Sequence, residues 1–310
     1  MKQKQRGSDR HKTKVKVTLK AKEIELKGKK FELEPLVEKM APGFERVPEL
    51  VSEAMGIQLT APEIEFLLFD NEGFKKYVLE TSGEEYKGHY VAFYHRGKKN
   101  IPIDVEKSAI GWSDITQMNE PDDMEFVVAI GIMSCAYHEV AHMTNDLYDK
   151  DALVKKDQLL REFYQSKKEK LDRIMEISKK EWKDTKPMEI IEFYRAPVEY
   201  WISYKHFIEM LKHRALNEGV ARWAEHEVIR KRSNKRFAKA LYGVPKSISV
   251  RKKIRLSFDD EYFFGYRFFE KISQMTDANV IRLAIQHNPT YVEMLYPQLY
   301  ILRMKAALLI

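Results

Sequence analysis

The most informative stretch of the chain is His138-Glu139-Val140-Ala141-His142, which follows an apolar run at residues 126–133. Two histidines four residues apart lie one above the other on a helix, where both can bind one zinc ion. A glutamate beside the first histidine can then act as general base toward a zinc-bound water. We therefore predict a central helix that carries two zinc ligands, His138 and His142, and a catalytic base, Glu139. The same pattern also arises by chance on ordinary helices, so further residues have to support it.

A third ligand is offered by the stretch Asn217-Glu218-Gly219-Val220-Ala221. Zinc held by two histidines needs one more protein ligand and keeps its fourth position open for water. Glu218 and Glu225 are seven residues apart and share one stripe of a helix. This pairing favours a ligand at Glu218 with an acidic partner behind the site, although solvated helix faces also carry such acids.

The order HExxH, then NEGxA, then a further glutamate at Glu225 resembles the gluzincin metallopeptidases, the group of thermolysin relatives and zinc aminopeptidases. The resemblance covers residues 60–145 and 214–295. It implies an α+β, zincin-like metallopeptidase fold with a small mixed sheet, a central HExxH helix and a mostly helical C-terminal half. It also implies Zn²⁺ held by His138, His142 and Glu218, and a peptide or protein substrate.

The chain departs from the family in two ways. Seventy-five residues separate His142 from Glu218, more than the family usually has, so we expect a helical insertion at about residues 150–205. No segment resembles the GxMEN element that binds a free amino terminus in the aminopeptidases. The resemblance therefore supports a zinc peptidase and leaves endo- or exopeptidase specificity open.

A second catalytic residue is implied at Tyr262-Phe263-Phe264-Gly265. In the aminopeptidase branch a YxxG helix follows the third ligand, and its tyrosine donates a hydrogen bond to the oxyanion. A phenol can do this without adding charge. An aromatic run such as residues 262–269 is more often a buried helix face, and His213 and His226 are alternative donors because thermolysin uses a histidine.

The composition suits a cytoplasmic protein without a membrane partner. No apolar run reaches the roughly 18 residues that span a bilayer, and the first residues lack the apolar core of a signal peptide. The single cysteine, Cys135, excludes an intramolecular disulfide and agrees with a reducing compartment. We interpret Cys135 as a small buried side chain.

The net charge of +7 lies entirely within residues 1–20, which predicts a basic, disordered arm ahead of a catalytic domain at 21–310. A solvated tail without a specific partner is the simpler interpretation. Two other functions stay open: a DNA- or RNA-associated protease guided by this arm, and a non-catalytic binding protein on a zincin scaffold.

Upstream of the HExxH helix the patterns predict short strands and helices. Alternation at 15–19 and 23–26 predicts a hairpin, and residues 36–55 predict a helix broken at Pro42 and Pro48. Further elements are expected as a buried strand at 63–69, a helix at 73–80, and strands at 90–94 and 101–105 joined by a turn. In zincins one sheet edge pairs with the substrate backbone, and either of the last two strands is a candidate for that edge.

The second half of the chain predicts helices only. The HExxH helix is expected to start near Asp122 or Asp123, and Pro187 and Pro197 are expected to break the insertion. A helix is predicted at 258–275, and shorter ones are expected to begin at Asp277 and Pro289. The apolar ending at 297–310 is expected to pack against the domain.

Overall fold

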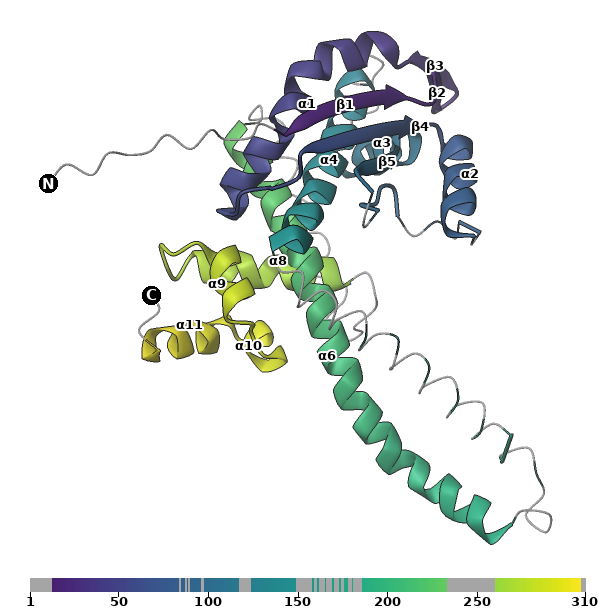
Figure 1. The fold of residues 1–310 in the computed structure, drawn as a ribbon, viewed down its shortest axis with the longest axis vertical. Helices are drawn as coiled ribbons and strands as arrows, with labels where there is room; N and C mark the ends of the chain where they lie inside the picture. The colour runs from purple at the N-terminus through teal and green to yellow at the C-terminus, as the bar shows by residue number, and fades with distance from the viewer. Residues whose placement is uncertain are drawn as a thin grey trace, which may run out of the picture. The chain divides into compact units, whose positions relative to one another are not determined.

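The chain folds into two compact units in the computed structural model (Figure 1). The first comprises Met1–Tyr148 and Val220–Arg255, and the second comprises Asp149–Gly219 and Leu256–Ile310. The structure describes residues 13–83, 85–86, 88, 90–95, 98–116, 124–148, 186–232 and 260–307, with single residues between 158 and 180. Residues 1–12 of the predicted arm and about half of the predicted insertion lie outside these ranges.

A small parallel sheet forms the centre of the first unit. Its strands, in spatial order, are β1 (Lys14–Leu19), β4 (Glu63–Phe69) and β5 (Asn100–Asp104). The central strand β4 coincides with the predicted strand and is almost fully buried through Ile64, Phe66 and Leu68, as expected for a strand covered on both faces. Because β1 starts at Lys14, the predicted arm of twenty residues is too long.

The predicted strand at 90–94 is reduced to one antiparallel bridge, between Ala92 and Ile103 of β5. The Asp104 amide donates to the Val91 carbonyl at 2.8 Å, and the Phe93 amide donates to the Pro102 carbonyl at 3.4 Å. Since Pro102 has no amide hydrogen, it cannot contribute a donor to this pairing. We call residues 91–94 the edge segment.

The predicted hairpin between residues 15–19 and 23–26 is wrong. Strand β2 (Glu23–Leu26) pairs with β3 (Lys29–Glu32), a strand that the sequence patterns did not indicate. Lys27 and Gly28 connect them and both have positive φ, 50° and 76°, which is typical of a two-residue hairpin turn. Strand β1 instead joins the central sheet, because its alternate side chains pack beside the buried β4.

Helix α1 (Glu34–Met55) runs unbroken through Pro42 and Pro48, contrary to the predicted breaks. Each internal proline costs a helix about 3 kcal/mol. The buried face of α1 offsets this cost: Phe44 packs on Phe66 of β4 with ring centroids 5.1 Å apart, and Val47 and Val51 are completely buried.

Two further helices precede the HExxH helix in the chain, α2 (Asn71–Ser82) after β4 and α3 (Val105–Thr116) after β5. Helix α2 was predicted, but α3 was missed, since its serines, threonine and glycine are weak helix formers. Helix α4 (Met124–Tyr148) carries the HExxH stretch, and Asp122 and Asp123 lie outside the described residues. Among the described residues, α4 alone is long and apolar enough for a membrane span, but 61% of its most apolar window is buried inside the protein. That burial marks α4 as a core helix.

The described part of the second unit is helical. Its helices are α6 (Pro187–Arg232), which continues into the first unit beyond Gly219, and α8 (Asp260–Ser273), α9 (Val280–Gln286), α10 (Tyr291–Leu295) and α11 (Pro297–Ala306). The predicted C-terminal helices are present, although α9 and α10 begin three and two residues after the predicted Asp277 and Pro289, and the ending packs as expected through the buried Tyr300 and Met304. Pro187 opens α6 as a break should, but the helix continues through Pro197, so that predicted break is wrong.

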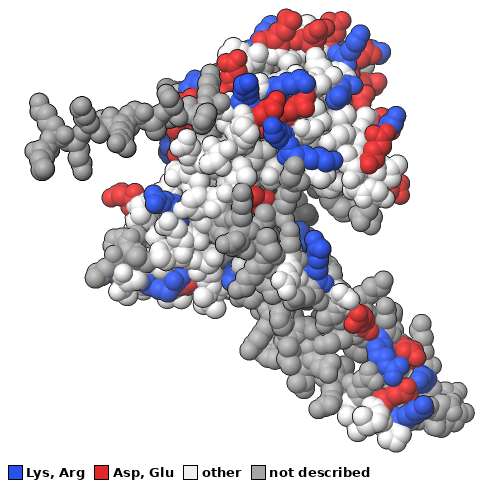
Figure 2. All heavy atoms as spheres, viewed as in Figure 1, with Lys and Arg blue, Asp and Glu red and all other residues white. Residues whose placement is uncertain are grey.

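The fold is therefore a mixed α and β fold that is mostly helical with a small sheet. On the face seen in Figure 2, acidic and basic side chains are intermixed over the described surface of the first unit. Several form exposed ion pairs, among them Lys30 with Glu23 and Lys39 with Glu125. The visible described surface offers no single-sign stripe of the kind that follows a nucleic-acid backbone.

Candidate metal centre

Helix α4 brings the two histidines of the HExxH stretch together. The Nε2 atoms of His138 and His142 are 3.2 Å apart, and the rings are nearly perpendicular. A tetrahedral zinc ion with bonds of 2.0–2.1 Å places two nitrogen ligands about 3.3 Å apart. The two imidazoles therefore already have the spacing of a shared ion.

Glu218 completes the set of three ligand atoms. One of its carboxylate oxygens and one nitrogen of each histidine all lie within 4.8 Å of one another. The boundary between the two units falls inside α6, one residue after Glu218, so the same unbroken helix carries Glu218 and the buried Glu225 of the first unit. Two imidazole nitrogens and one carboxylate oxygen form a donor set typical of catalytic zinc. The residues present thus fit the ion that the sequence predicts.

Glu225 lies behind His138 and is completely buried. Its Oε2 is 3.3 Å from His138 Nδ1, and Arg222 donates to both carboxylate oxygens at 2.9 and 3.1 Å. The Ser134 hydroxyl donates to the other oxygen, Oε1. This is the acidic partner that the spacing of Glu218 and Glu225 predicted.

The charge of Glu225 fixes the tautomer of His138. Burial by itself raises the pKa of Glu225, but the Arg222 guanidinium and His138 outweigh it and hold that pKa far below its usual range. An ionised Glu225 accepts a hydrogen from Nδ1, which leaves the lone pair of His138 on Nε2. That lone pair faces Nε2 of His142, an arrangement that a cation or a shared proton stabilises.

Glu139, the predicted base, is also buried and is held from outside α4. Its Oε2 accepts a hydrogen bond of 2.7 Å from the backbone amide of Tyr94, at the end of the edge segment. A backbone donor fixes the carboxylate without relying on a mobile side chain. The predicted base is thereby tied to the edge of the sheet.

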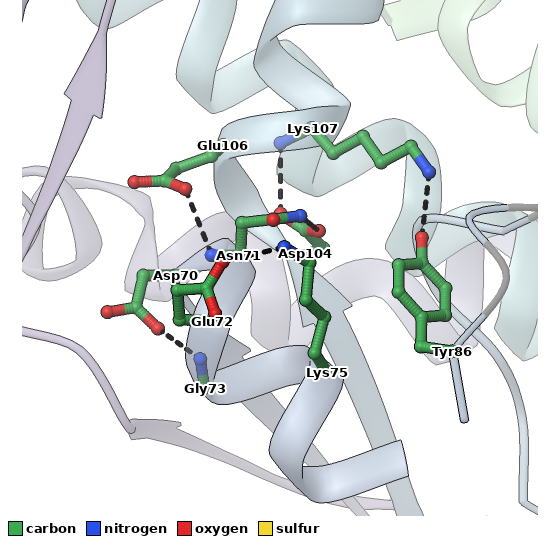
Figure 3. A network of polar contacts seen from close by, with 9 residues as sticks. All are labelled: Asp70, Asn71, Glu72, Gly73, Lys75, Tyr86, Asp104, Glu106 and Lys107. Carbon is green, nitrogen blue, oxygen red and sulfur yellow. Dashed lines mark hydrogen bonds and ion pairs between the residues drawn. The ribbon is translucent and has the colours of Figure 1, made fainter. Parts of the chain in front are cut away.

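A polar network joins the chain just ahead of the edge segment to α2, β5 and α3 (Figure 3). The Lys107 ammonium donates to the Tyr86 hydroxyl at 2.8 Å and to the Gly88 carbonyl at 2.5 Å, just ahead of the edge segment. Asp104 accepts from the Lys107 amide at 2.9 Å and from the Asn71 side chain at 2.6 Å. Burial raises the pKa of Asp104, and these donors only partly offset it. The network joins α2, β5 and α3 into one support.

The structure describes the three candidate oxyanion donors, Tyr262, His213 and His226, less fully than the proposed ligands. Tyr262 lies in the first turn of α8, three residues before Gly265, and its side chain is outside the described part of the structure. Burial lowers the pKa of His226 to about 4, so this ring is neutral at pH 7. The structure therefore does not choose among Tyr262, His213 and His226.

Cys135 is buried one turn before His138, as interpreted from the sequence. Burial raises the pKa of its thiol well above the usual value, with the carboxylates of Glu139 and Glu225 adding to the effect. The side chain stays a neutral thiol and behaves as a small core residue.

Two supporting contacts were missed from the sequence. Ser134 precedes His138 by four residues, so helical spacing did contain a signal for its contact with Glu225. No local pattern connects Tyr94 with Glu139, because 45 residues separate them. That contact depends on the path of the chain across the sheet.

Comparison with known proteins finds no relative of this chain. No protein-family model matches the chain, and neither a curated protein nor a solved structure matches it significantly. The functional argument consequently rests on the residues and geometry of the centre itself.

Proposed function

We propose that the chain is a zinc-dependent peptidase that hydrolyses peptide bonds with His138, His142 and Glu218 as zinc ligands. The observation that supports this most is the gathering of these three ligand atoms within 4.8 Å. A structural zinc site is closed by four protein ligands, whereas a catalytic site has three. The group found among the described residues has three, and the residue after His138 is a buried glutamate.

The proposed chemistry assigns one task to each residue. When bound, zinc would act as a Lewis acid toward water and the substrate carbonyl. Glu139 takes a proton from the attacking water and passes it to the leaving amine. Tyr262 is proposed to donate a hydrogen bond to the oxyanion as the tetrahedral intermediate forms.

The proposed substrate is an extended peptide that lies along the edge segment. The Ala92 bridge makes this segment the outermost backbone paired with β5 among the described residues. Strand addition to such an edge would bring a peptide carbonyl toward Glu139, which the Tyr94 amide holds. The reducing cytoplasm is the proposed compartment, in keeping with the single buried cysteine.

The metal part of the proposal is tested by the zinc content of the purified protein. We expect one zinc per chain, and we expect Glu218→Gln to lose it or to bind it about 10-fold or more weakly, because one of three ligands is removed. Glu227→Gln is the matched control, since Glu227 lies on the same helix and pairs with Arg230. Zinc retained in Glu218→Gln would mean that the third ligand is misassigned.

The catalytic part is tested by Glu139→Gln on a mixture of peptide substrates. We expect this variant to keep its zinc and to lose hydrolysis by at least about 100-fold, because the general base is gone. Zinc binding without hydrolysis by the wild type would instead favour a binding protein on the same scaffold.

A further inference from the structure

Helices α6 and α8 cross at direct backbone contact beside the proposed ligand Glu218. A Cβ atom added to Gly265 would lie 1.8 Å from the Ala215 carbonyl oxygen and 2.8 Å from the Gly219 Cα atom. A Cβ atom on Gly219 would lie 2.5 Å from the Gly265 carbonyl carbon. Ala215 and Gly219 are four residues apart and so share the face of α6 that meets α8. Only glycine permits this approach at either position.

Gly111 and Gly43 do not share this crowding, and at Gly131 of α4 the nearest backbone atom, the Ser108 carbonyl carbon, would lie 3.0 Å away. A Cβ atom on Gly111 of α3 would meet no other atom within 4 Å, and one on Gly43 of α1 would meet only the Met133 side chain, at 3.7 Å. Glycine also weakens a helix interior relative to alanine. At Gly219 and Gly265 glycine has a specific benefit, because it lets the backbones of α6 and α8 come into direct contact.

The C-terminal core holds α8 at this crossing. Phe268 and Phe269 are buried, and Phe268 packs on Tyr300 of α11 with ring centroids 5.4 Å apart. On the preceding turn, Phe264 packs on Tyr291 of α10 at 5.8 Å. The position of α8 is therefore set by the second unit, and α8 in turn meets α6 next to Glu218.

We propose that Gly219 and Gly265 are positioning residues of the zinc centre, because their contact fixes the turn of α6 that carries Glu218. The same contact brings the first turn of α8, with Tyr262 one turn before Gly265, to the ligand-bearing part of α6. Neither glycine touches the ion. This inference rests on the proposed metal centre and assigns to the C-terminal helices a role in building it.

The first test uses the wild-type protein and hydrogen exchange. If the crossing fixes Glu218, binding of zinc stabilises the crossing in return, since coupling between two sites is reciprocal. We expect added zinc to slow amide exchange in α8 around residues 264–269, although α8 supplies none of the three proposed ligands. Protection confined to α4 and α6 would overturn the inference and leave the zinc centre intact. A wild type that binds no zinc would overturn the proposed function and this inference together.

The second test compares Gly219→Ala and Gly265→Ala with the control Gly111→Ala. The readout is the rise in the thermal midpoint when zinc is added, which reports zinc affinity separately from the stability of the zinc-free protein. We expect zinc affinity to fall about 10- to 100-fold in both crossing variants, the range seen when residues that orient a ligand are lost, and to stay unchanged in Gly111→Ala. A midpoint lowered equally with and without zinc would show a purely structural crossing and overturn the inference. If neither variant folds, the exchange result in the wild type decides.

Discussion

Position 225 combines complete burial with a full negative charge. An unpaired carboxylate in that environment would be strongly destabilising. Here Ser134, His138 and Arg222 supply hydrogen bonds to both oxygens of Glu225, so the charge is satisfied and also directs the His138 ring. One residue thus links the stability of the α4–α6 contact with the orientation of His138, a proposed zinc ligand.

Replacement of Glu225 by glutamine is expected to weaken both properties. Glutamine has a similar shape, but its amide group brings hydrogens toward the Arg222 and Ser134 donors. We expect the zinc-free protein to lose about 2–4 kcal/mol of unfolding free energy in urea, because a buried ion pair is broken on one side. Zinc affinity, measured by chelator competition, should fall about 10- to 100-fold as His138 loses its partner.

The control for this variant is Glu227→Gln, two residues along the same helix. Its partners Arg230 and Lys231 are more than half exposed, so we expect a change of less than about 1 kcal/mol. Equal effects of the two substitutions would show that Glu225 has no special role.

Among the elements, α1 and the C-terminal helices illustrate opposite relations between local sequence and structure. Helix α1 contains two internal prolines and exists because its apolar face packs on the sheet. Helix α10 is five residues long and is stabilised locally by a capping box, in which Thr290 and Glu293 bond each other's backbone amides. Arg303 of α11 adds a two-pronged ion pair to Glu293, with contacts of 2.6 and 3.1 Å.

The α10–α11 pair should therefore weaken in acid. Burial alone raises the pKa of Glu293, but the hydrogen bonds from Arg303 and from the Thr290 amide outweigh it and leave that pKa below its ordinary value. A lowered folded-state pKa gives stability that is present above the unfolded value of about 4.3 and is lost as the pH falls through the folded value. We expect Glu293→Gln to lower the free energy of unfolding by about 1 kcal/mol at pH 7 and by progressively less below about pH 4.

Thermal unfolding at several pH values checks this expectation. Glu72→Gln serves as the control, because its ion pair with Lys75 is exposed and should matter little at any pH. If Glu293→Gln were less stable than the wild type by the same amount in acid as at pH 7, the effect could not be assigned to the charge of Glu293.

For the whole molecule, the distribution of charge decides how the nucleic-acid alternative must be tested. Residues 1–20 carry the whole formal excess, but the Thr13 hydroxyl bonds the Ala61 carbonyl and the Lys14 amide bonds the Pro62 carbonyl. A deletion of twenty residues would remove β1 and unfold the sheet. The informative deletion ends at residue 12.

We expect the protein without residues 1–12 to keep its zinc content and its peptide hydrolysis, with or without added DNA or RNA. The reason is that the three proposed ligands and Glu139 lie on α4 and α6, far along the chain from residues 1–12. Rates of hydrolysis measured with and without nucleic acid check this. Hydrolysis that required nucleic acid and disappeared with the arm would establish the DNA- or RNA-associated protease instead.

The sequence by itself determined the elements whose patterns are local. The apolar run of β4 and the aromatic face of α8 each placed an element correctly, and the short C-terminal helices begin within three residues of the predicted Asp277 and Pro289. The helical spacing in HExxH and between Glu218 and Glu225 likewise singled out the three residues that the structure brings together and the buried glutamate behind them. These patterns suffice because neighbours on one helix or strand are set by backbone geometry alone.

Only the tertiary structure decided which elements meet. It paired β1 with β4 and β2 with β3, kept α1 whole across its prolines, brought the Tyr94 amide to Glu139, and set Gly265 against Gly219. An apolar face records that a residue is buried but not which surface buries it, so several pairings satisfy the same pattern. The choice among them follows from packing over the whole chain, which is where the final geometry of the centre is fixed.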